Sequence, residues 1–292
     1  MAARILALTL HSGENELPAC KHSLAEQTLP PAEHVVLSGL GNVEAHRALY
    51  ATIMKRADEF DLFLKIDADM VVSRPTALAE VAALFAREPE LDHIQVAVYD
   101  HFTDALIPGV HVFSGRVRWP SLHAGDRLFV DASPRYPGRF LNDPPGLAPF
   151  IDHAPDPSPY QAFHYGYHRA LKLYQPARRW KNPMRAKRFL RVLDRVERHH
   201  AARPGERLAL VLEAAELVRQ GRLTGVTGDK DDEAVRLAFA RLQGLRGARR
   251  WTGGWIQRLD PAAFPLRLAW EIYGTALLRS LSPCLRSNPP SS

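Results

Sequence analysis

The fold is decided by the stretch Asp61-Leu62-Phe63-Leu64-Lys65-Ile66-Asp67-Ala68-Asp69 of this 292-residue chain. Its first part is a short apolar run, as in a strand that is buried on both faces of a sheet. The run ends in two carboxylates, Asp67 and Asp69, which are two positions apart. Because like charges repel and an unpaired buried charge is costly, we expect a divalent cation beside this pair.

Strands and helices alternate on both sides of this stretch. Apolar runs bounded by turn residues predict strands at 4–10, 34–38 and 94–99, and helical periodicity predicts helices at 18–27, 43–57 and 75–87. This alternation predicts an α/β fold built on an open sheet with right-handed crossovers. Ligands bind outside the carboxyl ends of the strands in such sheets, so we expect the segments 11–14, 38–41 and 67–69 to form one binding site.

The rest of the chain divides into a loop-rich segment and a helical segment. Residues 100–160 are rich in proline, glycine and aromatic residues, with short strands expected at 109–117 and 148–153. Long loops on a rigid sheet commonly bind substrates. Helical patterns from residue 161 onward predict helices at 161–174, 183–199, 206–220, 231–246 and 262–281. We therefore predict two domains, an α/β domain at 1–175 and a basic helical extension at 176–292.

Composition and charge limit the classes of partner. A hydrophobic content of 46% and a charged content of 24% are ordinary for a folded protein. The formal net charge is +6, and basic residues dominate from Arg169 to Arg198, where only Asp194 and Glu197 are acidic. This pattern suits nucleotide diphosphates, anionic lipid or nucleic acid, and it is equally typical of a solvated helical face. Since no helix-turn-helix, zinc or single-strand-binding signature is visible, we do not expect a nucleic-acid partner.

The cysteines and apolar runs predict a cytoplasmic protein. Cys20 and Cys284 match no CxxC spacing, which favours a reducing compartment. The apolar run at 5–10 is too short for a secretory signal, and no run reaches the roughly 18 apolar residues of a membrane span. The segment 264–281 instead predicts an amphipathic helix, which would either contact the inner face of a membrane peripherally or, as we favour, pack on the sheet domain.

The chemistry of the Asp67 and Asp69 pair indicates a hard cation. Carboxylate oxygens with open coordination positions suit Mg²⁺ or Mn²⁺, which would then bridge to a diphosphate. In this interpretation Asp69 is a direct ligand, and Asp67 reaches the metal through water or holds a ribose. Lys65 would face the same cleft. The alternative for two such carboxylates alone is a solvated acidic turn.

The order of these features resembles the family-2 glycosyltransferases of the GT-A fold. The segment Ser23-Leu24-Ala25-Glu26-Gln27-Thr28-Leu29-Pro30 is similar to the helix end of that family, and it stands between the expected strands at 5–10 and 34–38 and before the carboxylates of 63–69. The resemblance implies a Rossmann-like α/β fold with an open mixed sheet. It also implies transfer of a sugar from a nucleoside-diphosphate sugar to a hydroxyl group of a glycan or lipid-linked acceptor, with Mn²⁺ or Mg²⁺ and inversion at the anomeric carbon. Such enzymes make polysaccharides and cell-surface glycans.

The resemblance also implies roles for single residues. The loop from His11 through Ser12 to Glu14 would lie near the nucleobase. Ser38 stands where the family often has an acidic residue that contacts the base or ribose, and this departure leaves the donor open. His153, at the end of an expected strand, resembles a third metal ligand.

The second half contains candidates for the remaining roles. The Gly-Gly-Phe-Asp-Glu signature of the family is absent, and Asp126 precedes the expected strand 148–153 at the distance at which many members place their general base. Asp143 and Asp152 are rivals for this role, and Asp126 is alternatively paired with an arginine. Arg169 and Lys172 would hold the diphosphate leaving group, where positive charge stabilises developing negative charge. His164 and His168 share a helix face, and we favour a structural pair over a metal site there.

Three other functions fit parts of the sequence. Asp67-Ala68-Asp69-Met70-Val71-Val72 resembles the nucleophile motif of haloacid-dehalogenase-type phosphatases, with Asp67 as nucleophile, and residues 228–232 faintly resemble their distal metal motif. That nucleophile normally follows the first strand, which is not the case here. A sugar-nucleotide pyrophosphorylase would need a basic phosphate loop where residues 11–16 are acidic. A catalytically inactive GT-A-like binding module is the third alternative.

Overall fold

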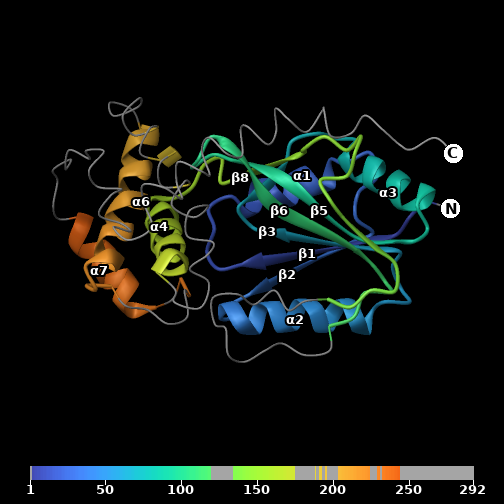
Figure 1. Ribbon diagram of the computed structural model, residues 1–292, viewed down its shortest axis with the longest axis horizontal. Coiled ribbons are helices and arrows are strands. Elements are labelled where there is room, and N and C mark those ends of the chain that lie inside the picture. Colours follow the sequence, from blue (N-terminus) through green and yellow to red (C-terminus); the bar gives the residue numbers. More distant parts are fainter. Residues whose placement is uncertain are drawn as a thin grey trace, which may run out of the picture.

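The computed structural model describes residues 2–119, 134–174, 188, 191–192, 195, 203–223, 229–230 and 232–243. Its centre is an eight-stranded mixed sheet in the order β2-β1-β3-β6-β5-β8-β4, with β7 paired to β5. Helices α1 and α3 cover one face of the sheet and α2 covers the other, while α4, α6 and α7 lie together at one end (Figure 1). The fold is therefore α/β with an open mixed sheet, as predicted.

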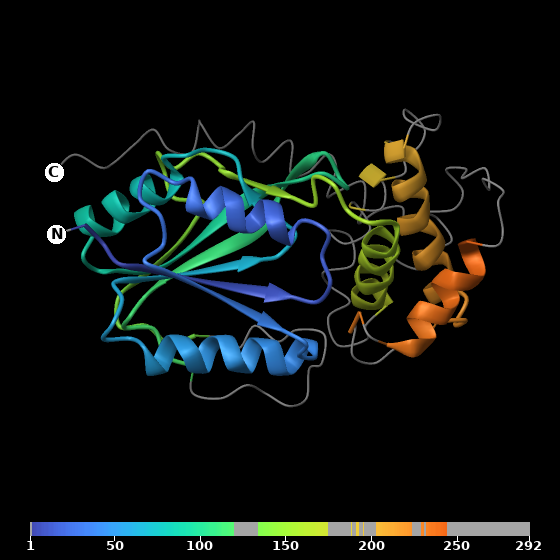
Figure 2. The same cartoon turned by 180° about the vertical axis from the view of Figure 1, so that it is seen from behind.

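The strands divide into a parallel part and a mixed part. The parallel part is β1 (Ile5–His11), β2 (Glu33–Ser38) and β3 (Leu62–Asp67), with β1 in the middle. The mixed part is β4 (Met70–Val72), β5 (Leu91–Asp100), β6 (Ala105–Ser114), β7 (Arg139–Asn142) and β8 (Ile151–His153). The carboxyl ends of β1 and β2 point toward the helical end of the molecule (Figure 2).

The helices match the predicted ranges closely. They are α1 (Leu17–Ala25), α2 (Asn42–Lys55), α3 (Ala77–Arg87), α4 (Pro159–Tyr174), α6 (Arg203–Arg219) and α7 (Glu233–Gln243). The expected helix 262–281 lies outside the described residues, and so does 183–199 apart from 188, 191–192 and 195. No helix in the described part of the chain is long and apolar enough to cross a membrane.

The continuous apolar runs of the central strands are explained by burial on both faces of the sheet. In β1, Ile5 and Ala7 belong to the core under α1 and α3, whereas Leu6 and Leu8 belong to the core under α2. All four are at most 1% exposed. A strand covered on both faces has no solvent side, so its sequence does not alternate between apolar and polar residues.

The strand β6 begins earlier than the prediction of 109–117 and runs antiparallel between β3 and β5. The sequence pattern did not predict its first half, because proline and glycine usually interrupt strands and residues 108 and 109 are Pro108 and Gly109. Gly109 is required here, since a Cβ atom at this position would lie 2.2 Å from Cγ1 of Val98 on β5. The three-residue β4 and the four-residue β7 were also missed, because strands this short leave little pattern in the sequence.

The helical end is held together by close packing of α4 on α6. Ala162 and Ala170 of α4 and Val211 and Leu212 of α6 are fully buried in one cluster. At Gly166 the helices approach so closely that a Cβ atom would lie 2.0 Å from the backbone oxygen of Val211. The predicted domain boundary at 175 falls between these two helices, and the division into 1–175 and 176–292 stays a prediction.

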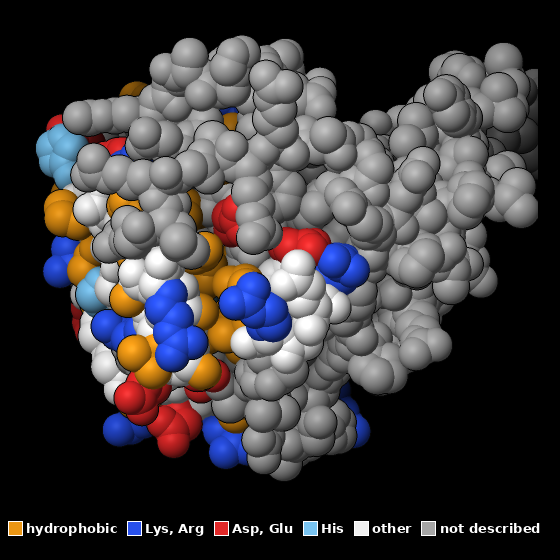
Figure 3. Space-filling view, turned by 90° about the vertical axis from the view of Figure 1, so that its left-hand side faces the viewer, with side chains coloured by type: hydrophobic (Ala, Val, Ile, Leu, Met, Phe, Trp, Pro, Cys, Tyr) orange, Lys and Arg blue, Asp and Glu red, His pale blue; other side chains and the backbone are white. Residues whose placement is uncertain are grey.

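Charged and hydrophobic side chains share the surface at the end of the molecule where the helices lie (Figure 3). The side chain of Leu237 on α7 is 49% exposed there. Most of the basic stretch 169–198 beyond α4 lies outside the described residues, so its role as a membrane-facing or phosphate-binding surface remains a prediction.

Candidate active site

A cavity of about 570 Å³ lies at the carboxyl ends of β1 and β3, facing α4. Nine of the site residues predicted from the sequence line it, namely His11, Ser12, Glu14, Lys65, Asp67, Asp69, His153, Arg169 and Lys172. Ser38 does not line the cavity, but its hydroxyl lies 3.0 Å from Nδ1 of the lining residue His11. Asp126, the predicted base, lies outside the described residues. The three segments expected to meet at this edge of the sheet therefore do meet.

Strand register brings Asp69 and His153 together. Met70 of β4 pairs with His153 of β8, and His153 also pairs with Asp100 of β5. The backbone oxygen of Asp69 accepts a hydrogen bond of 2.7 Å from the amide of Ala154, which fixes the turn before β4 against the end of β8. Nε2 of His153 consequently lies 3.5 Å from Oδ2 of Asp69.

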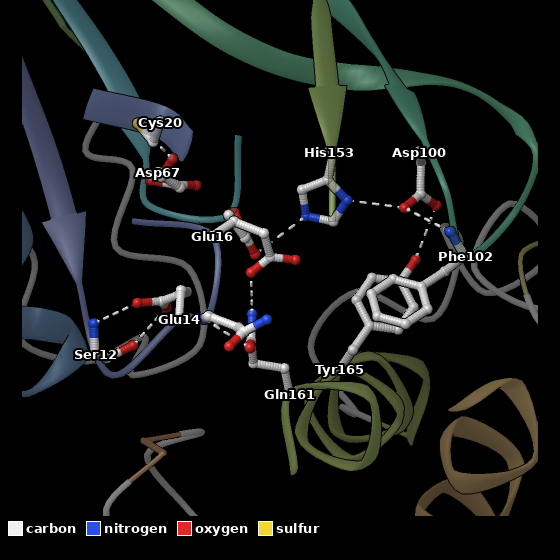
Figure 4. Close-up of polar contacts among 12 residues, drawn as sticks. Ser12, Glu14, Glu16, Cys20, Asp67, Asp100, Phe102, His153, Gln161 and Tyr165 are labelled. Carbon is white, nitrogen blue, oxygen red and sulfur yellow. Dashed lines mark hydrogen bonds and ion pairs between the residues drawn. The ribbon is translucent and has the colours of Figure 1, made fainter. Parts of the chain in front are cut away.

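His153 stands between the carboxylates of Asp69 and Asp100, and Figure 4 shows its contact with Asp100. Its Nδ1 lies 2.8 Å from Oδ1 of Asp100, whose side chain is fully buried. Burial alone would lower the pKa of His153, but the charge of Asp69 and the hydrogen bond with Asp100 outweigh it and raise the pKa to about 10. Burial acts in the opposite direction on Asp69, where the attraction of His153 prevails and holds the pKa at about 2. The three groups thus form a charged row in which Asp100 and His153 are buried and the side chain of Asp69 is 22% exposed.

Several hydrogen bonds fix the carboxylate of Asp100, so it can hold the imidazole ring of His153 in one orientation. Its Oδ2 accepts hydrogen bonds from the hydroxyl of Thr103 at 2.5 Å and from that of Tyr165 on α4 at 3.2 Å. The backbone amide of Phe102 donates to Oδ1 at 3.3 Å. A carboxylate bonded to one histidine nitrogen, with the other nitrogen facing a ligand position, is the usual arrangement behind metal-binding histidines.

The residues present fit a hard divalent cation between Asp69 and His153. Oδ1 of Asp69 is buried without a hydrogen-bond partner in the described structure, although the residue lines the cavity. Within the described residues no three histidine, cysteine or acidic side chains converge as a complete metal-binding group. Asp69 and His153 would therefore supply two ligands and leave the other coordination positions to water and ligand oxygens, which is typical of Mg²⁺ and Mn²⁺ bound to phosphates.

Asp67 is placed differently from Asp69. Its side chain is 42% exposed, and one oxygen lies 3.9 Å from Nζ of Lys65, which is 10% exposed. The two carboxylates share the cavity, but only Asp69, whose side chain is 22% exposed, contacts His153. This asymmetry agrees with a direct metal role for Asp69 and an indirect role for Asp67, both of which stay predictions.

The loop after β1 is held by a network that includes Glu14. Both the amide and the hydroxyl of Ser12 donate to its carboxylate, at 2.6 and 2.8 Å. Lys230, which lies between α6 and α7, forms an ion pair with the same carboxylate. This pair joins the nucleotide-facing loop expected from the sequence to the helical extension.

A second acidic residue of this loop, Glu16, is 3% exposed and is held by Gln161 of α4. Nε2 of Gln161 donates to Glu16 Oε2 at 2.6 Å, while Oε1 of Gln161 accepts from the amides of Asn15 at 2.8 Å and Ser158 at 3.0 Å. Burial and then the charge of Asp69 raise the pKa of Glu16, against the effect of the Gln161 hydrogen bond. Gln161 therefore fixes the loop against the start of α4.

The wall opposite the strands is the basic face of α4. His164, His168, Arg169 and Lys172 all line the cavity. Nε of Arg169 and Nε2 of His168 are buried without a hydrogen-bond partner among the described residues, and the Arg169 guanidinium lies 5.0 Å from the ring centroid of Tyr165. Burial and then the neighbouring charge of Lys172 hold the pKa of His168 well below its usual value, so this imidazole is neutral. Such donors suit an anionic ligand.

Asp100, Gln161 and Lys230 are among the site residues that sequence patterns did not assign. Asp100 directly follows the predicted strand 94–99. Its position at the end of a strand of the same sheet could have identified it as a candidate. Gln161 and Lys230 left no such signal, because their roles come from contacts with residues that are distant in the chain.

Comparison with known proteins gives partial similarity only. No protein-family model matches the chain, and no curated protein sequence matches it. A mannosyltransferase from Pyrobaculum calidifontis in complex with GDP-Man and Mn²⁺ is similar over 93% of this chain and 88% of its own, with 14% identity and a TM-score of 0.35. A glycosyltransferase involved in glycosylation of the major capsid of PBCV-1 is similar over 52% and 94%, with 13% identity and a TM-score of 0.33.

The protein A197 from STIV is similar over 33% of this chain, with 18% identity and a TM-score of 0.27. The matched region spans 47% of A197, which is under half of its length. Likeness at this level does not establish an activity. The chain's own strand order and cavity define it as an α/β protein with a cavity lined by charged residues at the carboxyl ends of its parallel strands.

Proposed function

We propose that this protein is a glycosyltransferase that moves a sugar from a nucleoside-diphosphate sugar to a hydroxyl group of an acceptor. The observation that carries the proposal is the charged row Asp69–His153–Asp100, in which Asp69 lines the cavity and has one oxygen without a hydrogen-bond partner among the described residues. Mn²⁺ or Mg²⁺ held by Asp69 and His153 would neutralise the diphosphate of the donor.

The remaining walls suit the other parts of such a donor. His11, Ser12 and Glu14 offer polar groups for the nucleoside, and Ser38 acts on this region through its contact with His11. Arg169 and Lys172 on α4 present positive charge for the diphosphate across the cavity. Charge that develops on a leaving group is stabilised most by cations that are already in position.

The finer parts of the proposal come from the sequence. We assign Asp126 as the base that takes the proton of the acceptor hydroxyl, an inverting displacement, and a glycan or lipid-linked acceptor in the synthesis of polysaccharide or cell-surface glycan. We place the reaction in the cytoplasm, with peripheral contact at the inner membrane face as the role of 264–281 if that segment does not pack on the sheet domain.

Calorimetric titration tests the proposal directly. UDP and GDP, and UDP-glucose and GDP-mannose, are titrated into the full chain with Mn²⁺ and with EDTA. We expect at least one of the nucleotides to bind with Mn²⁺ and to bind at least about 10-fold more weakly with EDTA, since a cation held by Asp69 and His153 would neutralise the charge of the diphosphate. Absence of nucleotide binding in both conditions, together with Mg²⁺-dependent hydrolysis of p-nitrophenyl phosphate, would replace the transferase with the phosphatase that uses Asp67.

The positioning role of Asp100 gives a second expected result. Asp100→Asn should weaken Mn²⁺ binding about 10-fold or more, because loss of an outer carboxylate makes the histidine a poorer and less well oriented ligand. Manganese titration followed by electron paramagnetic resonance measures this affinity without turnover. Thr103→Val is the matched control, since it removes a hydrogen bond to Asp100 Oδ2 and leaves the contact of Oδ1 with His153. Equal manganese affinity in Asp100→Asn and wild type would contradict the role.

A further inference from the structure

Lys230 reaches the cavity from the helical extension, and its position is fixed by contacts with distant elements. Its backbone oxygen accepts a hydrogen bond of 2.5 Å from the hydroxyl of Tyr160 on α4. The preceding residue, Asp229, accepts a hydrogen bond of 2.7 Å from the amide of Asn42 at the start of α2. The backbone that carries the Lys230 side chain is therefore held by hydrogen bonds to α4 and to the start of α2, on both sides of the cavity.

The side chain of Lys230 lies inside the site. It is 13% exposed, and the side chain of its partner Glu14 is 8% exposed. Both residues line the cavity together with Asp69. One ammonium group thus lies beside the carboxylate of Glu14 in the same cavity that Asp69 lines.

The charges around Lys230 change when a donor binds. Without a ligand, Lys230 offsets the charge of Glu14. A nucleoside diphosphate sugar brings two negative charges, and a third develops as the diphosphate leaves. An ammonium group that is already oriented in a partly dehydrated site stabilises this extra charge more than it stabilises the bound donor.

We propose that Lys230, oriented by Glu14, is a further cation that stabilises the leaving diphosphate. The inference rests on the proposed transferase function. In the step concerned, the bond between the anomeric carbon and the diphosphate oxygen breaks, and its electron pair stays on that oxygen beside Lys230. The acceptor oxygen forms the new bond to the anomeric carbon, and its proton passes to the general base.

This assignment makes the extension part of the donor site. Arg169 and Lys172, the cations already assigned to the diphosphate, belong to α4, whereas Lys230 lies between α6 and α7 and contacts the loop after β1. Lys230 and the two α4 cations approach from different elements, so loss of Lys230 leaves the others in place.

The test measures nucleotide affinity in Lys230→Gln by calorimetry, with UDP and GDP each in the presence of Mn²⁺. We expect affinity for the bound diphosphate to fall about 10- to 100-fold, the usual range for a hydrogen bond between charged groups. Affinity for the corresponding nucleoside, uridine or guanosine, measured by saturation-transfer NMR, should stay within about twofold, since a nucleoside carries no phosphate. Lys55→Gln removes an exposed lysine from the end of α2 and should leave both affinities unchanged.

Two further variants separate the effect of the Lys230 charge on diphosphate affinity from the effects of the substitution on neighbouring residues. Lys230→Gln leaves Glu14 unpaired, so the same substitution is also made in a Glu14→Gln background, where it should again cost at least 10-fold in diphosphate affinity. Lys230→Arg keeps the charge and should recover most of the affinity, which a purely structural role would not require. Thermal unfolding is measured for every variant.

The outcomes distinguish this inference from the proposed function. If the wild type binds neither UDP nor GDP with Mn²⁺, the transferase proposal fails. If the wild type binds one of them and Lys230→Gln binds it equally well, or loses nucleoside affinity by the same factor, only the role of Lys230 is overturned. The inference is also overturned if Glu14→Gln alone binds the diphosphate as tightly as the wild type and the added Lys230→Gln substitution costs no affinity in that background, because the effect would then belong to the unpaired glutamate.

Discussion

Asp69→Asn should abolish turnover and remove the Mn²⁺-dependent part of nucleotide binding. Asn at this position keeps the shape of the side chain but loses the charge that attracts both the cation and His153. A metal ion contributes several kcal/mol to stabilisation of a reacting phosphate, so we expect a loss of about 10³-fold or more in kcat/KM. Calorimetry with Mn²⁺ and with EDTA measures the binding part, and release of nucleotide from the sugar donor measures turnover.

The other carboxylate of the pair is the matched control for this substitution. Asp67→Asn changes the same chemical group two residues away, at a side chain that is 42% exposed and lies beside Lys65. We expect a smaller loss, about 10-fold, because a residue that acts through water or on the ribose can be replaced in part by solvent. Mn²⁺-dependent nucleotide binding that survives in Asp69→Asn would remove the metal role of Asp69, and equal losses in both variants would remove the asymmetry between them.

Gly166→Ala should destabilise the protein by about 2–3 kcal/mol, as expected for an added methyl group in a tightly packed interface. The new Cβ atom would lie 2.0 Å from the backbone oxygen of Val211 and 2.7 Å from its carbonyl carbon. These are backbone atoms, so no side-chain rotation can relieve the clash and α4 must move away from α6. Chemical denaturation followed by circular dichroism measures the loss.

Helix propensity alone predicts that Gly166→Ala increases the stability of the protein, so the experiment distinguishes the two effects. Alanine is favoured over glycine inside a helix by about 1 kcal/mol, so Gly166→Ala would stabilise α4 if its neighbour were absent. Gly41→Ala is the control, because a Cβ atom there would lie 3.5 Å from Asp229 Oδ2, which is an ordinary contact. We expect a change below about 1 kcal/mol in this control, as for an uncrowded helix start. A gain in stability for Gly166→Ala would show that the close contact of α4 and α6 does not exist in solution.

The sequence by itself determined the parallel part of the sheet and the side of it that carries the site. The strands β1, β2 and β3 and the helices between them were predicted because burial on both faces of a sheet requires short apolar runs, and these are visible locally. The rule that loops at the carboxyl ends of parallel strands converge then placed His11, Glu14, Lys65 and Asp69 together, and the cavity confirms that they meet.

Only the tertiary structure decided which residues touch one another inside that site. Asp100 lies behind His153 because β5 and β8 pair in one particular register, and a shift by one residue would turn its side chain to the other face of the sheet. Lys230 meets Glu14 across 216 positions of the chain. The local pattern of apolar and polar residues indicates whether a residue is buried. It does not indicate which distant residue lies against it. The charges and pKa values of the site depend on those distant partners.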